Sequence, residues 1–309
     1  MREIVEALEA QLNTVVQGKP EKIRLSVLCL LAEGHLLIED FPGLGKTTLA
    51  RAIAASINGT FRRIQFTPDL MPTDITGVSI FRQDSSTFEF HPGPVFANIV
   101  LADEVNRASP RTQSALLEVM SERTVSYDGT TYPIKPPFMV VATQNPVELE
   151  GTYSLPEAQL DRFLMKINMG YPDRHSELRL LRDDNGADRL RDIRPVVTLT
   201  QLQDLVKIVQ AVYVADAALE YIVRLVEATR NHDDVKLGCS PRSAIGLLRV
   251  SKASALVNGR DHVLPSDIAD VATAVMSHRL VLHSLDMDSR DVTTQILNDT
   301  PVPPQGQWS

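Results

Sequence analysis

A glycine-containing stretch, Gly43-Leu44-Gly45-Lys46-Thr47-Thr48, follows the short apolar run 36–38 and precedes a helical pattern. Glycines let backbone N–H groups converge on phosphate oxygens, and the amino end of the following helix attracts negative charge. In such a loop the Lys46 ammonium reaches the last two phosphates of a nucleotide, and the Thr47 hydroxyl binds Mg²⁺. Asp40 stands where the pattern G-x-x-x-x-G-K-[ST] begins with glycine. The strand–loop–helix order is nevertheless kept, so the stretch predicts a phosphate-binding loop.

Two adjacent acids, Asp103 and Glu104, end the apolar run 98–102. Acids at the carboxyl end of a parallel strand point into the crevice where ligands bind. Asp103 offers carboxylate oxygens to Mg²⁺, and Glu104 is placed to polarise an attacking water. Taken alone, such a pair is as compatible with a solvated strand end, but its position after the phosphate loop favours chemistry.

Asn145 follows a further apolar run, 138–143. Its amide has the chemistry to orient a water or to contact the last phosphate of a bound nucleotide. A plain turn at the end of a strand is the alternative, since Pro146 follows directly.

Short apolar runs alternate with helical patterns in the first half of the chain and predict a parallel sheet covered on both faces. The expected strands are 36–38, 61–67, 98–103, 138–143 and 163–168, and the expected helices include 4–12, 19–33 and 46–57. Beyond Tyr171-Pro172 helical periodicity dominates, in 178–182, 202–209, 217–229, 241–256 and 266–279. We therefore expect an α/β core over 1–185, a helical domain over 186–285, and a loose polar tail over 286–309 that contains Trp308.

Composition narrows the class of protein. The chain has 309 residues and a formal net charge of −8, which argues against a generally basic nucleic-acid coat. Cys29 and Cys239 have neither metal-ligand spacing nor a disulfide framework, so a reducing compartment is expected. No run approaches the roughly 18 apolar residues of a membrane helix, and the amino terminus lacks the apolar region of a signal peptide. We expect a cytoplasmic protein without a membrane span.

Taken together, the motifs resemble those of the MoxR family of AAA+ ATPases. The resemblance covers about residues 5–282 and is carried by FPGLGKT, LADEVNRASPRTQSALLEVMSER, ATQNPVELEGTYSLPEAQLDRFLMK and GCSPRSAIGLLRVSKA. It implies a P-loop NTPase (AAA+) parallel-sheet core flanked by helices, followed by an all-α lid domain. It also implies ATP and Mg²⁺ as ligands and a homo-oligomeric ring, usually a hexamer, with nucleotide between neighbouring subunits.

The resemblance assigns roles to several side chains. Asp103 is implied to bind Mg²⁺, Glu104 to activate water, and Asn145 to act as a sensor residue. Arg162 is implied to be an arginine finger that reaches the last phosphate of the next subunit's nucleotide, where its charge would stabilise the transition state. A structural pair with Asp161 is the plain alternative for Arg162. The rivals for the finger are three other arginines, Arg107, Arg111 and Arg123.

Further roles are implied around the nucleotide. Arg242, in the string SPR at the start of a lid helix, matches the second sensor and would couple the last phosphate to lid closure. An ordinary arginine at a helix start is the alternative. Val16 and Gly18 resemble the segment that contacts adenine, and Tyr171-Pro172 resembles the hinge beside it. Apolar packing would equally explain the valine.

Two β-hairpins are predicted as insertions in the core. The first has strands 77–82 and 87–90, and the second spans 124–134 around the turn Asp128-Gly129. In rings of this kind such hairpins often face the central pore. Covering the edge of a sheet is the alternative role.

The resemblance implies an Mg²⁺-dependent ATPase that remodels a client protein like a chaperone, in maturation or cofactor loading of a partner complex. The partner in this family is often a von Willebrand factor A-domain protein. A nucleic-acid motor related to the helix-insert helicases is the alternative, although the first hairpin has one base, Arg82, against the acids Asp84 and Glu89. A catalytically inactive scaffold is a third hypothesis, which the intact nucleotide residues oppose.

Overall fold

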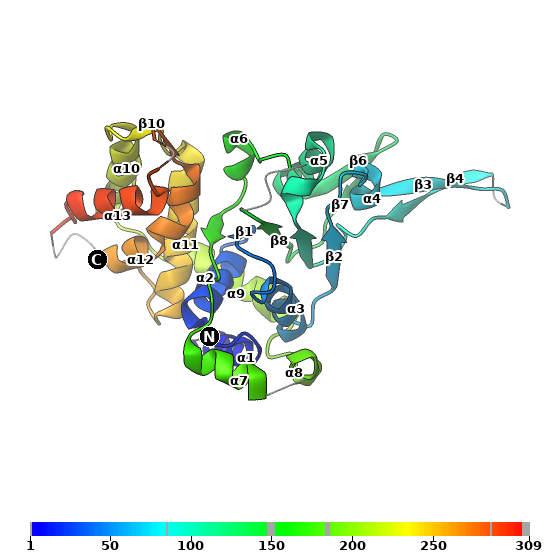
Figure 1. The fold of residues 1–309 in the computed structure, drawn as a ribbon, viewed down its shortest axis with the longest axis horizontal. Coiled ribbons are helices and arrows are strands. Elements are labelled where there is room, and N and C mark those ends of the chain that lie inside the picture. Colours follow the sequence, from blue (N-terminus) through cyan, green and yellow to red (C-terminus); the bar gives the residue numbers. More distant parts are fainter. Residues whose placement is uncertain (1, 85, 147–151, 183–185, 285, 305–309) are drawn as a thin grey trace.

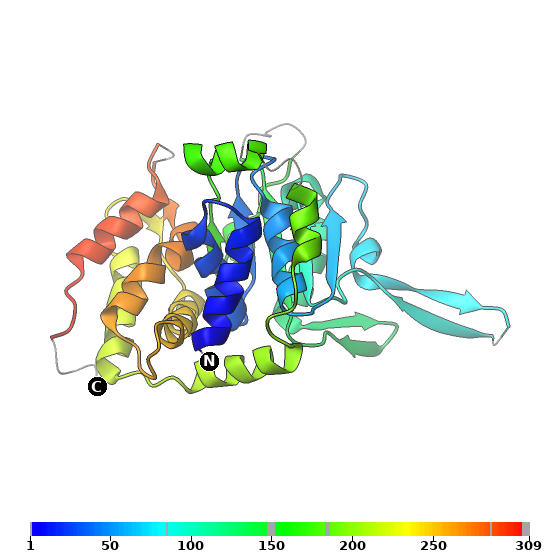
Figure 2. The same cartoon turned by 90° about the horizontal axis from the view of Figure 1, so that it is seen from below.

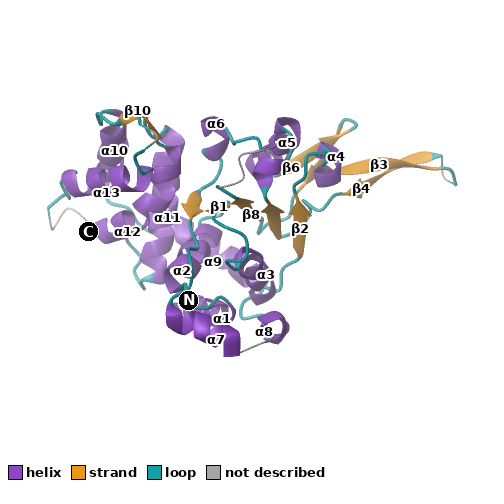
Figure 3. Ribbon diagram, in the orientation of Figure 1, coloured by secondary structure: helices purple, strands orange, loops and turns teal. Residues whose placement is uncertain are grey.

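The computed structural model describes residues 2–84, 86–146, 152–182, 186–284 and 286–304, and five parallel strands form its central sheet (Figure 1, Figure 3). Their order is β2 (Phe61–Gln65), β5 (Ile99–Asp103), β8 (Met139–Gln144), β1 (Leu36–Glu39) and β9 (Met165–Ile167). The expected α/β fold with a parallel-sheet core is confirmed. Because the strands are parallel, the loops that follow them meet at one edge of the sheet.

Alternate side chains of the strands enter two separate hydrophobic clusters, as the period of two in a strand requires. Leu36 and Ile38 of β1 belong to the cluster formed with helices α1, α2 and α3, whereas Leu37 belongs to the cluster formed with α5. The bounds of these helices are Arg2–Val15, Pro20–Leu31, Lys46–Ser56 and Pro110–Glu122. Both faces of the sheet are thus covered, which explains why β5 is buried along its length and reads as an unbroken apolar run before Asp103.

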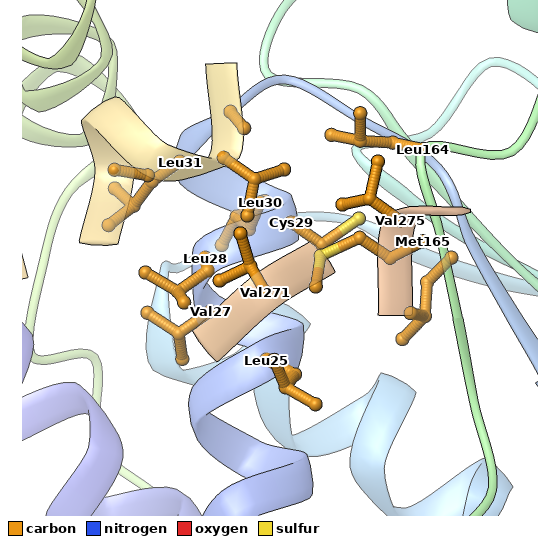
Figure 4. Close-up of a cluster of buried hydrophobic side chains, with 14 of the residues drawn as sticks. Leu25, Val27, Leu28, Cys29, Leu30, Leu31, Leu164, Met165, Val271 and Val275 are labelled. Atoms are coloured by element: carbon orange, nitrogen blue, oxygen red, sulfur yellow. The ribbon is translucent and has the colours of Figure 1, made fainter. Parts of the chain in front are cut away.

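From α9 (Leu199–Ala211) onward the chain forms a lid of helices beside the sheet (Figure 2). Its helices are α9, α10 (Asp216–Arg230), α11 (Pro241–Val257), α12 (Pro265–Met276), η2 (Ser277–Arg279) and α13 (Ser289–Asp299). A short ladder of β10 (Val235–Leu237) with β11 (Val281–Leu282) lies among them. Figure 4 shows where the lid joins the core: Cys29 of α2, Met165 of β9 and Val275 of α12 pack in one apolar cluster.

Short helices connect these parts of the chain. They are α4 (Pro72–Thr76), η1 (Val105–Arg107), α6 (Glu157–Leu160), α7 (Arg174–Arg182) and α8 (Gly186–Asp192). The helix α8 follows the predicted domain division at residue 185, yet it packs against α1 and α3 of the core.

The expectation of a loose tail from residue 286 is wrong for the helix α13. Val292 and Ile296 are each 2% exposed and lie four residues apart, so they form one apolar stripe that packs on the lid. Asp288 caps the helix by accepting a hydrogen bond from the backbone N–H of Arg290. Polar residues dominate the rest of the segment and hide this stripe in the sequence. Trp308 lies outside the described residues.

Both predicted hairpins are present. The first pairs β3 (Gly77–Arg82) with β4 (Thr87–Pro92), and the second pairs β6 (Thr124–Tyr127) with β7 (Thr130–Pro133). The first hairpin projects far from the sheet (Figure 1, Figure 2), and Phe81 and Phe88 on it are 50% and 67% exposed. Phe90 at its base stacks on Tyr132 of the second hairpin, with ring centroids 4.1 Å apart.

Both cysteines are free and buried. Burial raises the pKa of each thiol above its ordinary value, so neither is set up as a nucleophile. Among the described residues, no helix has the length and apolar character to cross a membrane.

Candidate functional site

The phosphate loop joins the end of β1 to the start of α3 and leaves an open cradle. Gly43 and Gly45 have φ angles of 85° and 87°, in the left-handed region that favours glycine. Apart from each glycine's own atoms and those of its two chain neighbours, no atom lies within 4 Å of where a Cβ on either residue would stand. Gly45 is the N-cap of α3, so the first N–H groups of that helix face the same space. The loop therefore fits the binding of phosphate oxygens.

Lys46, the first residue of α3, is bonded back to the start of this loop. Its side chain is largely buried, and its Nζ donates a hydrogen bond of 2.6 Å to the backbone carbonyl of Asp40. Burial lowers the pKa of the Lys46 ammonium below its ordinary value, whereas the nearby carboxylates of Asp103, Asp40 and Glu104 act in the opposite direction. Asp40, Asp103 and Glu104, of which the last two are far from Lys46 in the sequence, therefore all lie close enough to interact electrostatically with it.

Asp40, the departure from the usual loop pattern, has a structural role. One carboxylate oxygen accepts the backbone N–H of Phe41 at 2.9 Å, and the other accepts that of Gly170 at 2.6 Å. These bonds tie the start of the phosphate loop to the segment that follows β9. The Asp40 side chain therefore anchors the start of the loop to a different segment of the chain.

Asp103 ends β5 and is bound on both carboxylate oxygens. Thr143 Oγ1 of the neighbouring strand β8 donates to Oδ1 at 2.6 Å. Arg63 on β2 donates to Oδ2 from Nε at 3.1 Å and from Nη2 at 2.7 Å. Mg²⁺ usually takes one or two carboxylates together with waters and phosphate oxygens, and the carboxylate of Asp103 and the hydroxyl of the half-buried Thr47 of α3 are oxygen donors of the kind that fits this ion.

Glu104 lies directly after β5 with a φ of 57°, which turns its side chain away from the strand direction. Its Oε2 accepts hydrogen bonds of 2.9 Å from Gln65 Nε2 and from Arg107 Nη1. The carboxylate is therefore held by two donors in this state. Arg107, a rival for the finger, is thus part of the chain's own site.

Asn145 is buried at the end of β8, the strand between β5 and β1. The strand order thus sets it between the acids and the phosphate loop, as a sensor residue requires. Its backbone carbonyl accepts a hydrogen bond of 3.5 Å from Asn106 Nδ2.

The segments expected beside adenine meet near the phosphate loop. Val16 is buried, and Gly18 has a φ of 69° with no room for a side chain, because a Cβ would lie 2.5 Å from Ser176 Oγ. The Lys19 ammonium donates to the carbonyl of Tyr171. The ring of Tyr171 stacks on Phe41 of the loop, with centroids 6.3 Å apart.

Arg162 and Arg242 lie at the opposite edge of the sheet. They line a hollow of about 470 Å³ together with Arg249 and with His35, which immediately precedes β1. Arg162 Nη1 donates to the Leu117 carbonyl at 2.6 Å and to Ser121 Oγ at 2.9 Å. The alternative of a pair between Arg162 and Asp161 does not occur, because Asp161 binds Arg279 instead. Neither predicted arginine is brought beside Lys46 of the same chain.

The other rivals for the finger differ in their surroundings. Arg123 forms an ion pair with Glu33 at 3.0 Å, at the rim of the same hollow. Arg111 is exposed at the start of α5.

Sequence reasoning missed Thr143, Gln65, Arg63 and Arg249. Gln65 pairs with Asp103 in the register of β2 with β5, so counting from the strand ends would have found it. Arg249 lies seven residues after Arg242, two turns along the same helix face. The contact of Thr143 with Asp103 depends on the neighbouring strand and has no local signal.

The sequence matches two known families along its length. One is described as the ATPase family associated with various cellular activities (AAA), over residues 35–165, and the other as the AAA lid domain, over residues 227–300. The second match extends through α13, in agreement with the packing of that helix on the lid.

Several relatives are similar over most of their length. The uncharacterised protein YeaC of Bacillus subtilis is 51% identical over 272 residues, 88% of this chain and 85% of that one. Chaperone MoxR1 of Mycobacterium tuberculosis is 45% identical over 282 residues, 88% and 74%. Protein MoxR of Methylorubrum extorquens is 33% identical over 305 residues, 91% and 88%. A crystal structure from Cytophaga hutchinsonii, described as a candidate ATPase, has a TM-score of 0.91 at 39% identity and covers 98% of this chain and 96% of that one.

Proposed function

The chain belongs to the MoxR family of AAA+ ATPases, and on that premise we propose that it hydrolyses ATP with Mg²⁺ at the loop between β1 and α3. The observation that supports this proposal best is the meeting of an open glycine loop, the buried Lys46 and the pair Asp103–Glu104 at one edge of the sheet. Nucleotides bind at this edge in open parallel sheets.

Each side chain has a separable task. Lys46 moves from the Asp40 carbonyl to the last phosphates, and Thr47 and Asp103 would hold Mg²⁺, which would supply positive charge to the phosphates. Glu104 leaves Gln65 and Arg107 and accepts a hydrogen bond from the attacking water. Asn145 holds that water or the last phosphate from the adjacent strand.

We further propose that the active form is a homo-oligomer, a hexameric ring, in which Arg162 and Arg242 serve the neighbouring subunit. A strand of five residues is roughly 16 Å long, so arginines at one edge of the sheet are too far from the phosphate loop at the other edge of the same chain. The hollow with Arg162 and Arg242 would instead receive the phosphates held by the next copy. Arg162 would then stabilise the charge of the transition state.

The biological role that we propose is chaperone-like remodelling of a client protein, with a von Willebrand factor A-domain protein as the expected partner and the cytoplasm as the expected location. Against a nucleic-acid motor, Arg82 on the first hairpin is already engaged by acids, with Nε 3.2 Å from Glu89 and 3.8 Å from Asp84. A surface that follows phosphates would leave such a base unpaired.

Phosphate release from ATP and Mg²⁺ tests the chemistry. Wild type should turn over, Lys46→Ala should lose ATP binding, and Glu104→Gln should bind ATP while turnover falls at least about 100-fold. Equal rates for wild type and Lys46→Ala would overturn the proposal. Failure of Glu104→Gln to bind ATP would remove Glu104 from the water-activating role.

The role in remodelling needs a different experiment. Glu104→Gln with ATP should trap the client, and mass spectrometry of proteins that co-purify with it but not with Lys46→Ala would identify the partner. Salt-dependent DNA binding that stimulates ATP hydrolysis would instead favour a nucleic-acid motor.

A further inference from the structure

The lid is bonded to the short segment that contains Arg162. Arg279 of η2 has a side chain only 3% exposed, and its Nε donates to Asp161 Oδ1 at 2.8 Å. Its Nη2 donates to the carbonyl of Phe163 at 2.8 Å, and its Nη1 donates to that of Leu164 at 3.4 Å. One buried guanidinium of the lid thus holds both sides of Arg162 in the chain.

A second element of the lid holds the same carboxylate. Ser240 Oγ donates to Asp161 Oδ2 at 3.0 Å. Ser240 is the N-cap of α11, two residues before Arg242. Asp161 therefore joins η2, the start of α11 and the segment of Arg162 through its two oxygens.

Close packing of Leu164 also joins this segment to the lid. Leu164 lies between two glycines: a Cβ on Gly34 would stand 2.1 Å from Leu164 Cδ2, and one on Gly246 would stand 3.0 Å from Leu164 Cδ1. Figure 4 shows Leu164 beside Val275 of α12 in the cluster that joins lid and core. The backbone that follows Arg162 is thus wedged against α11 and α12.

The guanidinium of Arg162 is held less firmly than its backbone. The two groups that accept hydrogen bonds from it, the Leu117 carbonyl and Ser121 Oγ, are uncharged groups of α5. Within the described part of the chain it has no carboxylate within ion-pair distance. A phosphate would therefore compete for it, because an anionic acceptor adds a Coulomb attraction to the guanidinium that the carbonyl and hydroxyl oxygens lack.

We propose that Asp161 and Arg279 are positioning residues that attach Arg162 to the lid of its own chain. The position of the lid then sets how far Arg162 reaches toward the nucleotide of the neighbouring subunit, and occupancy of that nucleotide acts back on the lid. This inference rests on the proposed function, with Arg162 as the finger.

The test compares Asp161→Asn with Arg162→Ala in steady-state ATP hydrolysis. Asp161→Asn keeps the shape of the side chain and removes the charge that holds Arg279. We expect kcat to fall between about 10- and 100-fold, since misplacing a group by about 1 Å costs up to that much, with KM for ATP within about twofold. Asp204→Asn is the matched control, because Asp204 is an exposed acid of α9 paired with Lys207.

Mixing subunits separates positioning of the finger from a defect in folding or in the chain's own site. Lys46→Ala subunits keep an intact Arg162, and Asp161→Asn subunits keep an intact phosphate loop. A mixture of the two should regain activity, as should a mixture of Lys46→Ala with Arg162→Ala. Ser240→Ala removes one hydrogen bond and no charge, so it tests the same attachment if Asp161→Asn does not fold.

Three results would count against the inference, and they differ from one another. Full activity of Asp161→Asn and Ser240→Ala, with Arg162→Ala inactive, would overturn the attachment and leave the ATPase proposal intact. Inactive Asp161→Asn that Lys46→Ala subunits fail to rescue would assign Asp161 to its own subunit's site or fold. Wild-type rates in Arg162→Ala would remove the finger itself, and the inference would fall with it.

Discussion

Thr143 Oγ1 donates a hydrogen bond of 2.6 Å to Asp103 Oδ1, from one central strand to the next. The same hydroxyl accepts the backbone N–H of Glu104 at 2.8 Å. Thr143 is fully buried, so no water is available to replace either bond. One hydroxyl thus holds the carboxylate of Asp103 and the backbone of Glu104.

Replacing Thr143 by valine should therefore impair both folding and turnover. The change keeps the shape of the side chain but leaves a buried N–H and a carboxylate oxygen without a partner, at a cost of about 1–3 kcal/mol in the free energy of unfolding. We expect urea unfolding to report that loss and phosphate release to fall about tenfold. Thr143→Ser retains the hydroxyl and should stay within about twofold of wild-type turnover; equal losses in both variants would contradict this role.

Gln65 is expected to restrain Glu104. Its amide donates to Glu104 Oε2 at 2.9 Å, and this hydrogen bond must break before that oxygen is free to accept one from water. Gln65→Ala should therefore raise client-free phosphate release about threefold, in line with one lost hydrogen bond of moderate strength. Lower turnover in Gln65→Ala would instead mean that the amide helps to hold the catalytic arrangement. Arg62→Ala, an exposed change on the same strand, serves as the control.

His35 makes the stability of the fold depend on pH. Its Nε2 contacts the Met120 carbonyl at 3.0 Å, its Nδ1 accepts the backbone N–H of Val140 at 2.9 Å, and burial lowers its pKa to about 4. The unfolded chain then binds a proton below about pH 6.5 that the folded chain refuses, so stability falls with falling pH between about 6.5 and 4. The share of His35 is about 3 kcal/mol over that window.

Unfolding in urea at several pH values measures this slope. His35→Asn should flatten it, and His91→Asn, which changes an exposed histidine of the first hairpin, should leave it unchanged. A slope that persists in full in His35→Asn would assign the effect to His278, whose pKa burial also lowers.

The helix α13 should contribute to stability although most of its residues are polar. Ile296 is 2% exposed against the lid, and truncation of a buried isoleucine to alanine costs about 2–4 kcal/mol in the free energy of unfolding. Gln295→Ala, one residue away on the exposed face, should change that free energy by less than about 0.5 kcal/mol. Similar values for both variants would mean that α13 does not pack as described.

The sequence predicted the features that depend on a local pattern of neighbouring residues. Apolar runs predicted the five strands, and the glycine loop with its neighbouring elements predicted the cradle before Lys46. Contacts made across the sheet or between core and lid have no such signal: Thr143 reaches Asp103 from the next strand, and Arg279 binds Asp161 from 118 residues away. The helix α13 was not predicted because two buried apolar side chains among polar residues give only a weak periodic pattern.

The stack of Phe90 on Tyr132 has a mechanical consequence. The first hairpin leads directly into β5, which ends at Asp103, and the second leads into β8, which precedes Asn145. Because these rings are in contact, the two hairpins are connected to each other at the base of the first hairpin. Force applied to the exposed tip near Phe88 would therefore reach both strands, and with them both Asp103 and Asn145 of the candidate site.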